Sequence, residues 1–170
     1  MSIFALVGGG RICELAAAEF PVNSSFTWVD VTTVSPAPEV GWSYAGGTFT
    51  APPAPPAPTL AQQAAAAVSA GLTLTLSGTL TLPATLFPTD ATTQGKLADM
   101  SAMAARGVLP LGATAYPMKD SAGLWHQFNA AQYQAVAGAI AAYAAALILI
   151  ADGNPLGVTA LPSASVSLTV

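Results

Sequence analysis

The sequence predicts an α+β protein with a small N-terminal β module, a proline-rich spacer and a C-terminal domain ordered helix, β-hairpin, helix, β-hairpin and long helix. Three observations predict this organisation: short apolar runs punctuated by glycines up to residue 51, the sequence PPAPPAP at residues 52–58, and alternating helical and two-residue periodicities from residue 59 onward. The expected divisions are therefore 1–51, 52–58, 59–153 and an extended tail at 154–170. We interpret the prolines as a semi-rigid polyproline II linker rather than a docking peptide, because PxxP alone is a weak signal.

The N-terminal module is expected to contain two hairpins and a further strand. Residues 3–7 and 11–15 flank three glycines, residues 26–31 are a strand candidate, and residues 41–50 have the composition of a second hairpin. The glycines do not form a nucleotide loop, because no GxGxxG or GK[ST] pattern follows them. The expected core of this module is aromatic and consists of Trp28, Trp42, Tyr44 and Phe49.

The C-terminal domain is expected to open with a helix and a leucine-rich strand. The spacing Thr59-x-x-Gln62 is typical of a capping box, and the alanine-rich helix behind it should run to about Ala70. Residues 72–82 (LTLTLSGTLTL) alternate leucine with threonine or serine, which predicts a strand with one buried face. A break at Ser77-Gly78 allows a hairpin, in which a two-residue loop would set Leu76 opposite Thr79 and mix the faces, whereas a three-residue loop sets Leu76 opposite Leu80 and keeps them matched. One long strand with a glycine bulge is equally consistent.

A second helix and a second hairpin are expected to follow. Thr89 and Asp90 supply N-cap chemistry for a helix that should end near Arg106, before Gly107 and Pro110. Its apolar stripe is expected to contain Leu97, Met100 and Met103 or Ala104. Residues 116–118 and 124–128 flank a polar, glycine-containing segment and therefore predict a hairpin.

The last helix has the sharpest pattern in the chain. Asn129-x-x-Gln132 is expected to cap it, and its large apolar residues then recur at spacings of 3, 4, 3, 4 and 3. This seam is either the core of one fold or a surface packed against symmetry mates, and the sequence leaves both open. The tail alternates weakly and is expected to add a strand to a neighbouring sheet edge. The candidate interface residues are Tyr133, Val136, Ile140, Tyr143, Leu147, Ile150, Val166, Leu168 and Val170.

Charged residues make up 7% of the chain, whereas a globular domain usually contains about a quarter. The net charge is −4 and the four Lys and Arg residues are scattered singly, which excludes the clustered basic face of a nucleic-acid-binding protein. Solubility normally depends on charged surface. Since 53% of the residues are hydrophobic, we expect other chains to cover much of this protein in a permanent homo-oligomer, for example a trimer.

Residues 130–151 form an uncharged run of 22 residues, long enough to cross a bilayer. The alanine-rich composition, Gln132 and Gln134, and the lack of Lys or Arg after Lys119 argue against a membrane span. The first ten residues have no basic region and only a short apolar run, so we expect no signal peptide and synthesis in the cytoplasm.

The sequence shows no pattern of catalytic residues, and we expect neither an enzyme nor a cofactor or metal. His126 is the single histidine and is expected to project from the strand face opposite Trp125. The sequence contains no G-x-S-x-G motif whose serine it could activate as a general base. Cys13 is expected to be a small buried hydrophobe rather than an activated thiolate. The four aspartates of the C-terminal domain are expected to act as cap or turn residues: Asp90, Asp99, Asp120 and Asp152.

Several segments taken together resemble proteins of tailed bacteriophages. FPVNSSFTWVDVT (20–32) and VGWSYAGGTFTAPP (40–53) resemble the N-terminal module of phage and prophage tail proteins, which commonly continue into a proline-rich spacer. The second half resembles a domain of uncharacterised function that recurs in those proteins, and the likeness covers about residues 20–152. The matching positions are Ser77-Gly78, Thr89-Asp90, Gln94, Leu97, Trp125 and the helix from Asn129 onward.

The resemblance implies a structural part of the virion tail, either a baseplate or tail-fibre component or an adaptor, whose partners are other tail, baseplate or fibre proteins. A tail-fibre assembly chaperone is one alternative, and a small membrane-active phage protein is another. The resemblance supplies no catalytic residue. The chain departs from the expected pattern in its longer leucine–threonine strand and its less charged final helix, and the second departure favours an oligomer.

Overall fold

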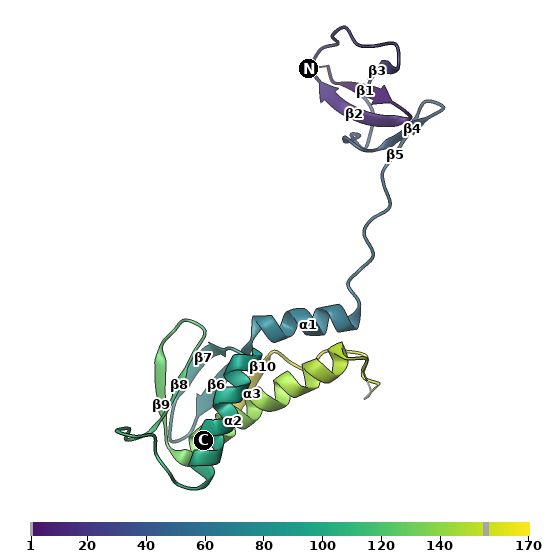
Figure 1. The fold of residues 1–170 in the computed structure, drawn as a ribbon. Helices are drawn as coiled ribbons and strands as arrows, with labels where there is room; N and C mark the ends of the chain where they lie inside the picture. Colours follow the sequence, from purple (N-terminus) through teal and green to yellow (C-terminus); the bar gives the residue numbers. More distant parts are fainter. Residues whose placement is uncertain (1, 155–156) are drawn as a thin grey trace. The chain divides into compact units, whose positions relative to one another are not determined.

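The computed structural model describes residues 2–154 and 157–170 and divides the chain into two compact units, Met1–Pro56 and Ala57–Val170. The division falls inside the proline-rich stretch, where no helix or strand forms between Thr50 and Leu60. Helices and sheets are both present, so the predicted α+β class is confirmed (Figure 1).

The first unit is a five-stranded sheet with the strand order β3-β1-β2-β4-β5. The strand bounds are β1 Phe4–Gly8, β2 Arg11–Ala16, β3 Phe26–Asp30, β4 Ser43–Ala45 and β5 Thr48–Thr50. Both predicted hairpins are confirmed, because β1 pairs antiparallel with β2 and β4 pairs antiparallel with β5. Gly9, Gly10, Gly46 and Gly47 turn these hairpins with positive φ, a conformation that glycine adopts without a steric penalty.

The core of the first unit differs from the aromatic cluster that the sequence predicts. Its fully buried side chains are aliphatic, and Trp42, Tyr44 and Phe49 pack against them only partly buried. The expectation for Trp28 is wrong, because its ring packs edge-on against Phe20 and its Nε1 donates a hydrogen bond to the Phe20 carbonyl at 2.9 Å. The aliphatic core residues are Ala5, Val7, Ile12 and Val31.

Cys13 is exposed, so the expectation that it is buried is also wrong. Side chains on a strand alternate between the two faces of the sheet, and Ile12 takes the core side of β2 with 2% exposure. Cys13 therefore projects to the other side.

The described part of the second unit contains three helices, and the predicted caps of all three are confirmed. They are α1 Leu60–Ala70, α2 Ala91–Ala105 and α3 Ala130–Ala151. Capping boxes with Thr59 and Asn129 as the N-caps begin α1 and α3, and Asp90 caps α2 by accepting from Thr93 N at 3.0 Å. Each cap satisfies backbone donors that the first helical turn leaves unpaired.

Two sheets accompany these helices (Figure 1). The larger has the order β10-β6-β7 and the smaller is the hairpin of β8 and β9. Their bounds are β6 Leu72–Ser77, β7 Leu82–Phe87, β8 Tyr116–Lys119, β9 Trp125–Phe128 and β10 Ser165–Thr169. The predicted hairpin of residues 116–118 and 124–128 is confirmed, with Met118 opposite His126.

The leucine–threonine segment forms a hairpin, but neither of the predicted registers. Leu76 lies opposite Leu82 instead of Leu80, and the returning strand continues to Phe87. Leu82 shares the face of Leu76, whereas Leu86 lies opposite Thr73 on the other face and is exposed. A register shift between Leu74 and Leu76 then sets Phe87, which is fully buried, opposite Leu72 in the core. Pro83 is compatible with a strand here because β7 lies at the edge of its sheet.

The tail of the chain is not a separate extended segment, contrary to the prediction. Strand β10 pairs in parallel with β6 of the same chain, so the expected strand addition at a sheet edge is confirmed, and the candidate interface residues of the tail pair within the chain. Val166 lies opposite Leu74 and Leu168 opposite Leu76, which aligns the apolar side chains of both strands. Val170 continues this match beyond the strand, because its N–H donates to the Ser77 carbonyl at 2.8 Å. A parallel pair needs a long crossover connection, and α3 is part of it.

The seam of α3 is the centre of the second unit. All six of its predicted interface residues are at most 6% exposed and belong to the core cluster that also contains Leu72, Leu74 and Leu76 of β6. The oligomer interpretation of this seam is therefore wrong and the intrachain alternative is correct. The large apolar side chains on one face of α3 pack on the leucine face of the sheet, because this removes the apolar area of both faces from water. The six residues are Tyr133, Val136, Ile140, Tyr143, Leu147 and Ile150.

Gly71 is the only residue between α1 and β6, and it makes this tight connection possible. Its φ of 89° and ψ of −177° lie in a region that is essentially restricted to glycine, and a Cβ atom there would lie 2.6 Å from the Phe87 carbonyl oxygen. We expect Gly71→Ala to lower the free energy of unfolding by about 1–3 kcal/mol or more.

Gly95→Ala is the matched control, because Gly95 lies inside α2 with open space around its Cα. This substitution should raise the free energy of unfolding by about 0.5–1 kcal/mol. Urea unfolding followed by circular dichroism measures both changes, and equal effects at the two glycines would contradict the account of Gly71.

Candidate functional site

The exposed side of α3 has a second apolar stripe, opposite the buried seam. Its residues recur at spacings of 4, 3, 4, 3 and 4, and none carries a charge. A helix at a protein surface normally presents polar and charged residues there. The last residue of this stripe is Leu149, whose side chain is 41% exposed. Ile148 lies next to it and is 45% exposed. We call the following residues the outward face of α3: Ala131, Ala135, Gly138, Ala142, Ala145, Ile148 and Leu149.

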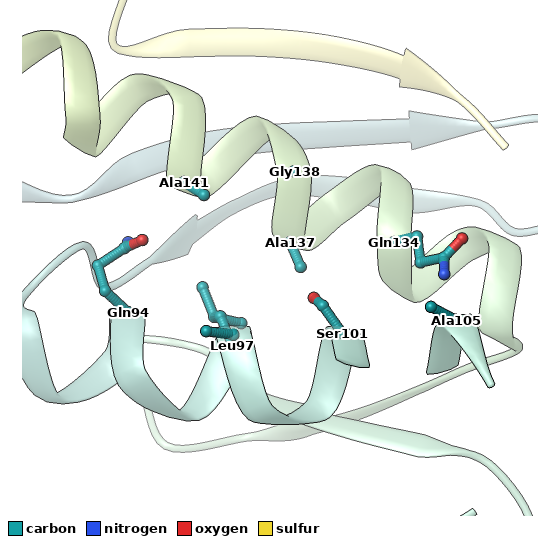
Figure 2. Close-up of a pocket in the computed structure, with 9 residues that line it drawn as sticks. Gln94, Leu97, Ser101, Ala105, Gln134, Ala137, Gly138 and Ala141 are labelled. Atoms are coloured by element: carbon teal, nitrogen blue, oxygen red, sulfur yellow. The ribbon is translucent and has the colours of Figure 1, made fainter. Parts of the chain in front are cut away.

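A groove of about 430 Å³ lies beside the outward face, between α2 and α3. Figure 2 shows Leu97 and Ser101 of α2 pointing toward Ala137 of α3, with small side chains on both walls. The Nε2 atom of Gln94 is buried at this groove without a hydrogen-bond partner among the described residues. An unpaired buried donor costs about 1–3 kcal/mol.

Charge is scarce over all three helices. Lys96 and Asp99 are the charged residues within their spans, and both belong to α2. The exposed residues of α1 are glutamine, serine and alanine. The helical side of the second unit is thus an almost uncharged surface of small residues.

The other side of the three-stranded sheet is polar without being charged. The alternation that buries the leucines of β6 turns hydroxyl side chains outward on β6 and β10. Leu86 of β7 is the exposed large apolar side chain on this face among the described residues, and Ile148 and Leu149 are those exposed on the helices. The hydroxyl residues are Thr73, Thr75, Ser77, Ser165, Ser167 and Thr169.

His126 stabilises a turn instead of standing free. Its Nε2 lies 2.9 Å from Asp120 Oδ2, and its ring packs 5.7 Å from the Phe87 ring. Asp120 Oδ1 accepts from Leu124 N at 2.9 Å and so closes the loop of the β8–β9 hairpin. The hydrogen bond from His126 holds the pKa of Asp120 below its usual range. The expectation that His126 is satisfied and lies opposite the exposed Trp125 is confirmed.

The other candidate chemical residues are not gathered together. Asp90 caps α2 and Asp152 caps the end of α3, as expected, whereas Asp99 lies mid-helix and has no cap or turn role. No group of three His, Cys, Asp or Glu side chains able to hold a metal ion exists within residues 2–154 and 157–170.

α3 is the one helix in the described part of the chain that is long and apolar enough to span a membrane. Length and composition alone identify it, and the core helix of a soluble protein has the same properties. Here its seam packs on the chain's own sheet, and α1 and α2 pack beside it.

Comparison with protein-family models, curated proteins and solved structures found no match to this chain. The phage resemblance therefore remains a sequence-based prediction.

Sequence reasoning missed the outward face and the groove. The signal was present, because alanine and glycine follow a second heptad-like spacing between the large residues of α3. Alanine is only weakly apolar, so the large residues of the seam dominate the apolar periodicity of this helix.

The Asp120–His126 pair predicts a specific pH dependence of stability. A carboxyl whose pKa is lowered on folding stabilises the protein above its unfolded pKa of about 3.9, and this contribution is lost as the pH falls through the folded pKa. We expect Asp120→Asn to lower the free energy of unfolding at pH 6 and to have a smaller effect near pH 3.

Urea unfolding at the two pH values measures this difference. Asp99→Asn is the matched control, because Asp99 is exposed on α2 and forms no ion pair among the described residues. A loss of stability in Asp120→Asn that is the same at both pH values would show that the charge of Asp120 plays no part.

Proposed function

We propose that this protein is a structural component of a bacteriophage tail, a baseplate or tail-fibre part or an adaptor, that assembles through apolar surfaces. The observation that carries the proposal is the uncharged outward face of α3 on a chain with only 7% charged residues. The resemblance of residues 20–152 to phage tail proteins supports the choice of assembly. The role is structural, and we assign no catalytic residue.

A second copy of the same chain is the partner that we propose for the outward face. Small residues let two helices approach closely, and an uncharged stripe can meet its own copy without like-charge repulsion. Ile148 and Leu149 supply the larger apolar side chains at one end of the face. Fully burying such a side chain contributes about 1.5–3 kcal/mol.

The groove between α2 and α3 extends this surface. A side chain from the second copy would fill it. Permanent interfaces are more apolar than transient ones and resemble a domain core cut in two. The almost uncharged helical side of the unit has the composition of such an interface.

The location of the protein is directly measurable. We expect mass spectrometry of purified phage particles, produced by the strain that encodes this chain, to detect it at a fixed ratio to the other tail proteins. Detection in lysates but not in finished particles would contradict a structural role and favour the assembly chaperone. If the protein is found in the membrane fraction and is released only by detergent, the membrane-active alternative would be favoured.

The two faces of α3 should respond differently to a new charge. Ala142→Glu places a carboxylate on the outward face, where solvent reaches it in the single chain, and should separate the oligomer while the chain stays folded. Ile140→Asp places a carboxylate at a fully buried position and should unfold the second unit, because an unpaired buried charge is very costly. Sedimentation velocity and circular dichroism distinguish the outcomes.

Ala102→Glu is the control for the outward-face variant. Ala102 is an exposed alanine of α2 and does not line the α2–α3 groove. It should leave both the sedimentation coefficient and the helical signal unchanged. If Ala142→Glu behaves in the same way as Ala102→Glu, the outward face of α3 does not hold the oligomer together.

A further inference from the structure

A second pocket, of about 540 Å³, lies between α2 and the β8–β9 hairpin. This volume is within the range of about 300–1,000 Å³ that is typical of small-molecule sites. Its floor is apolar and is formed by buried side chains, Leu97 of α2, Met118 of β8 and Tyr133 of α3. Burial raises the pKa of Tyr133 to about 12, so its phenol is neutral at pH 7 and adds no negative charge to the floor.

Two of the four basic residues of the chain lie on the walls of this pocket. Lys96 belongs to the α2 wall and Lys119 to the hairpin wall. Neither forms an ion pair with a carboxylate within the part of the chain that the structure describes. Asp120 also lines the pocket, but its two oxygens accept from Leu124 N and face His126 Nε2. The pocket is therefore locally positive in a protein whose net charge is −4.

Trp125 gives the pocket an exposed aromatic wall. Its side chain is 64% exposed, although tryptophan is usually highly buried in folded proteins. Lys119 lies directly opposite Trp125 in the strand register, and its Nζ is 5.8 Å from the centroid of the indole ring. A flat apolar surface and a positive charge are thus held side by side on the hairpin.

We propose that this pocket binds a small organic anion with a flat apolar body, such as an aromatic carboxylate or sulfonate. The flat body packs on the indole of Trp125 and on the apolar floor. The anionic group is placed between the ammonium groups of Lys96 and Lys119, which donate charge-assisted hydrogen bonds to it. This inference is independent of the phage assignment and of the outward face of α3, because no residue of that face lines the pocket.

Naphthalene-2-sulfonate tests the proposal on the full chain, with the neutral naphthalene-2-sulfonamide as the matched ligand. We expect isothermal titration calorimetry to show one sulfonate site per chain and binding of the sulfonamide weaker by about tenfold or more, a difference of about 1.4 kcal/mol. In the NMR spectrum, the sulfonate should shift the indole N–H signal of Trp125 and leave those of Trp28 and Trp42 unchanged.

Substitutions at the wall separate this site from nonspecific apolar binding. The double variant Lys96→Gln, Lys119→Gln should bind the sulfonate about tenfold more weakly or worse, and Trp125→Ala should weaken both ligands. Arg106→Gln, a cation outside the pocket, should change nothing. Equal affinity for the two ligands, an unchanged affinity in the double variant or an unshifted Trp125 signal would each overturn the proposal.

Discussion

The structure depends on α3, a helix that has apolar residues on two opposite faces. Only one of these faces is buried in the core of the second unit. The seam of α3, with Ile140 and Leu147 fully buried, covers the leucine face of β6 and holds α1 and α2 beside it. The opposite stripe contains Ala142 and Leu149, both of which are exposed among the described residues. Removing apolar area from water is the main favourable term in both folding and association, so the same helix supports a fold and predicts a partner.

The first turn of α3 connects two distant parts of the second unit, the β6–β7 loop and the C-terminal strand β10. Gln132 belongs to the capping box of α3, and its Nε2 donates to Thr79 Oγ1 at 3.1 Å. The Thr79 hydroxyl in turn donates to the Val170 carbonyl at 2.8 Å. These polar contacts connect the helix, the β6–β7 loop and the end of β10, which are far apart in sequence. They fix where β10 lies and so align Val166 and Leu168 with the leucines of β6.

Local features were predictable from the sequence, and distant pairings were not. The capping residues Thr59 and Asn129 act within four residues, so their patterns predict the starts of helices directly. The seam of α3 was visible as a periodicity, but its cover is supplied by β6 and β10, and no local pattern indicates this parallel pairing. Lys96 and Lys119 likewise meet at one pocket only through the fold. The small residues of the outward face were overlooked because alanine contributes weakly to an apolar pattern.

The most direct test of the central claim is the mass of the intact protein in solution, measured by light scattering as its concentration is raised through the micromolar range. An outward face that needs a second copy predicts a stable multiple of 16.9 kDa, with the helical signal of the folded chain. A folded protein that remains at 16.9 kDa throughout this range would show that α3 tolerates water along its whole apolar stripe, and the account would be wrong.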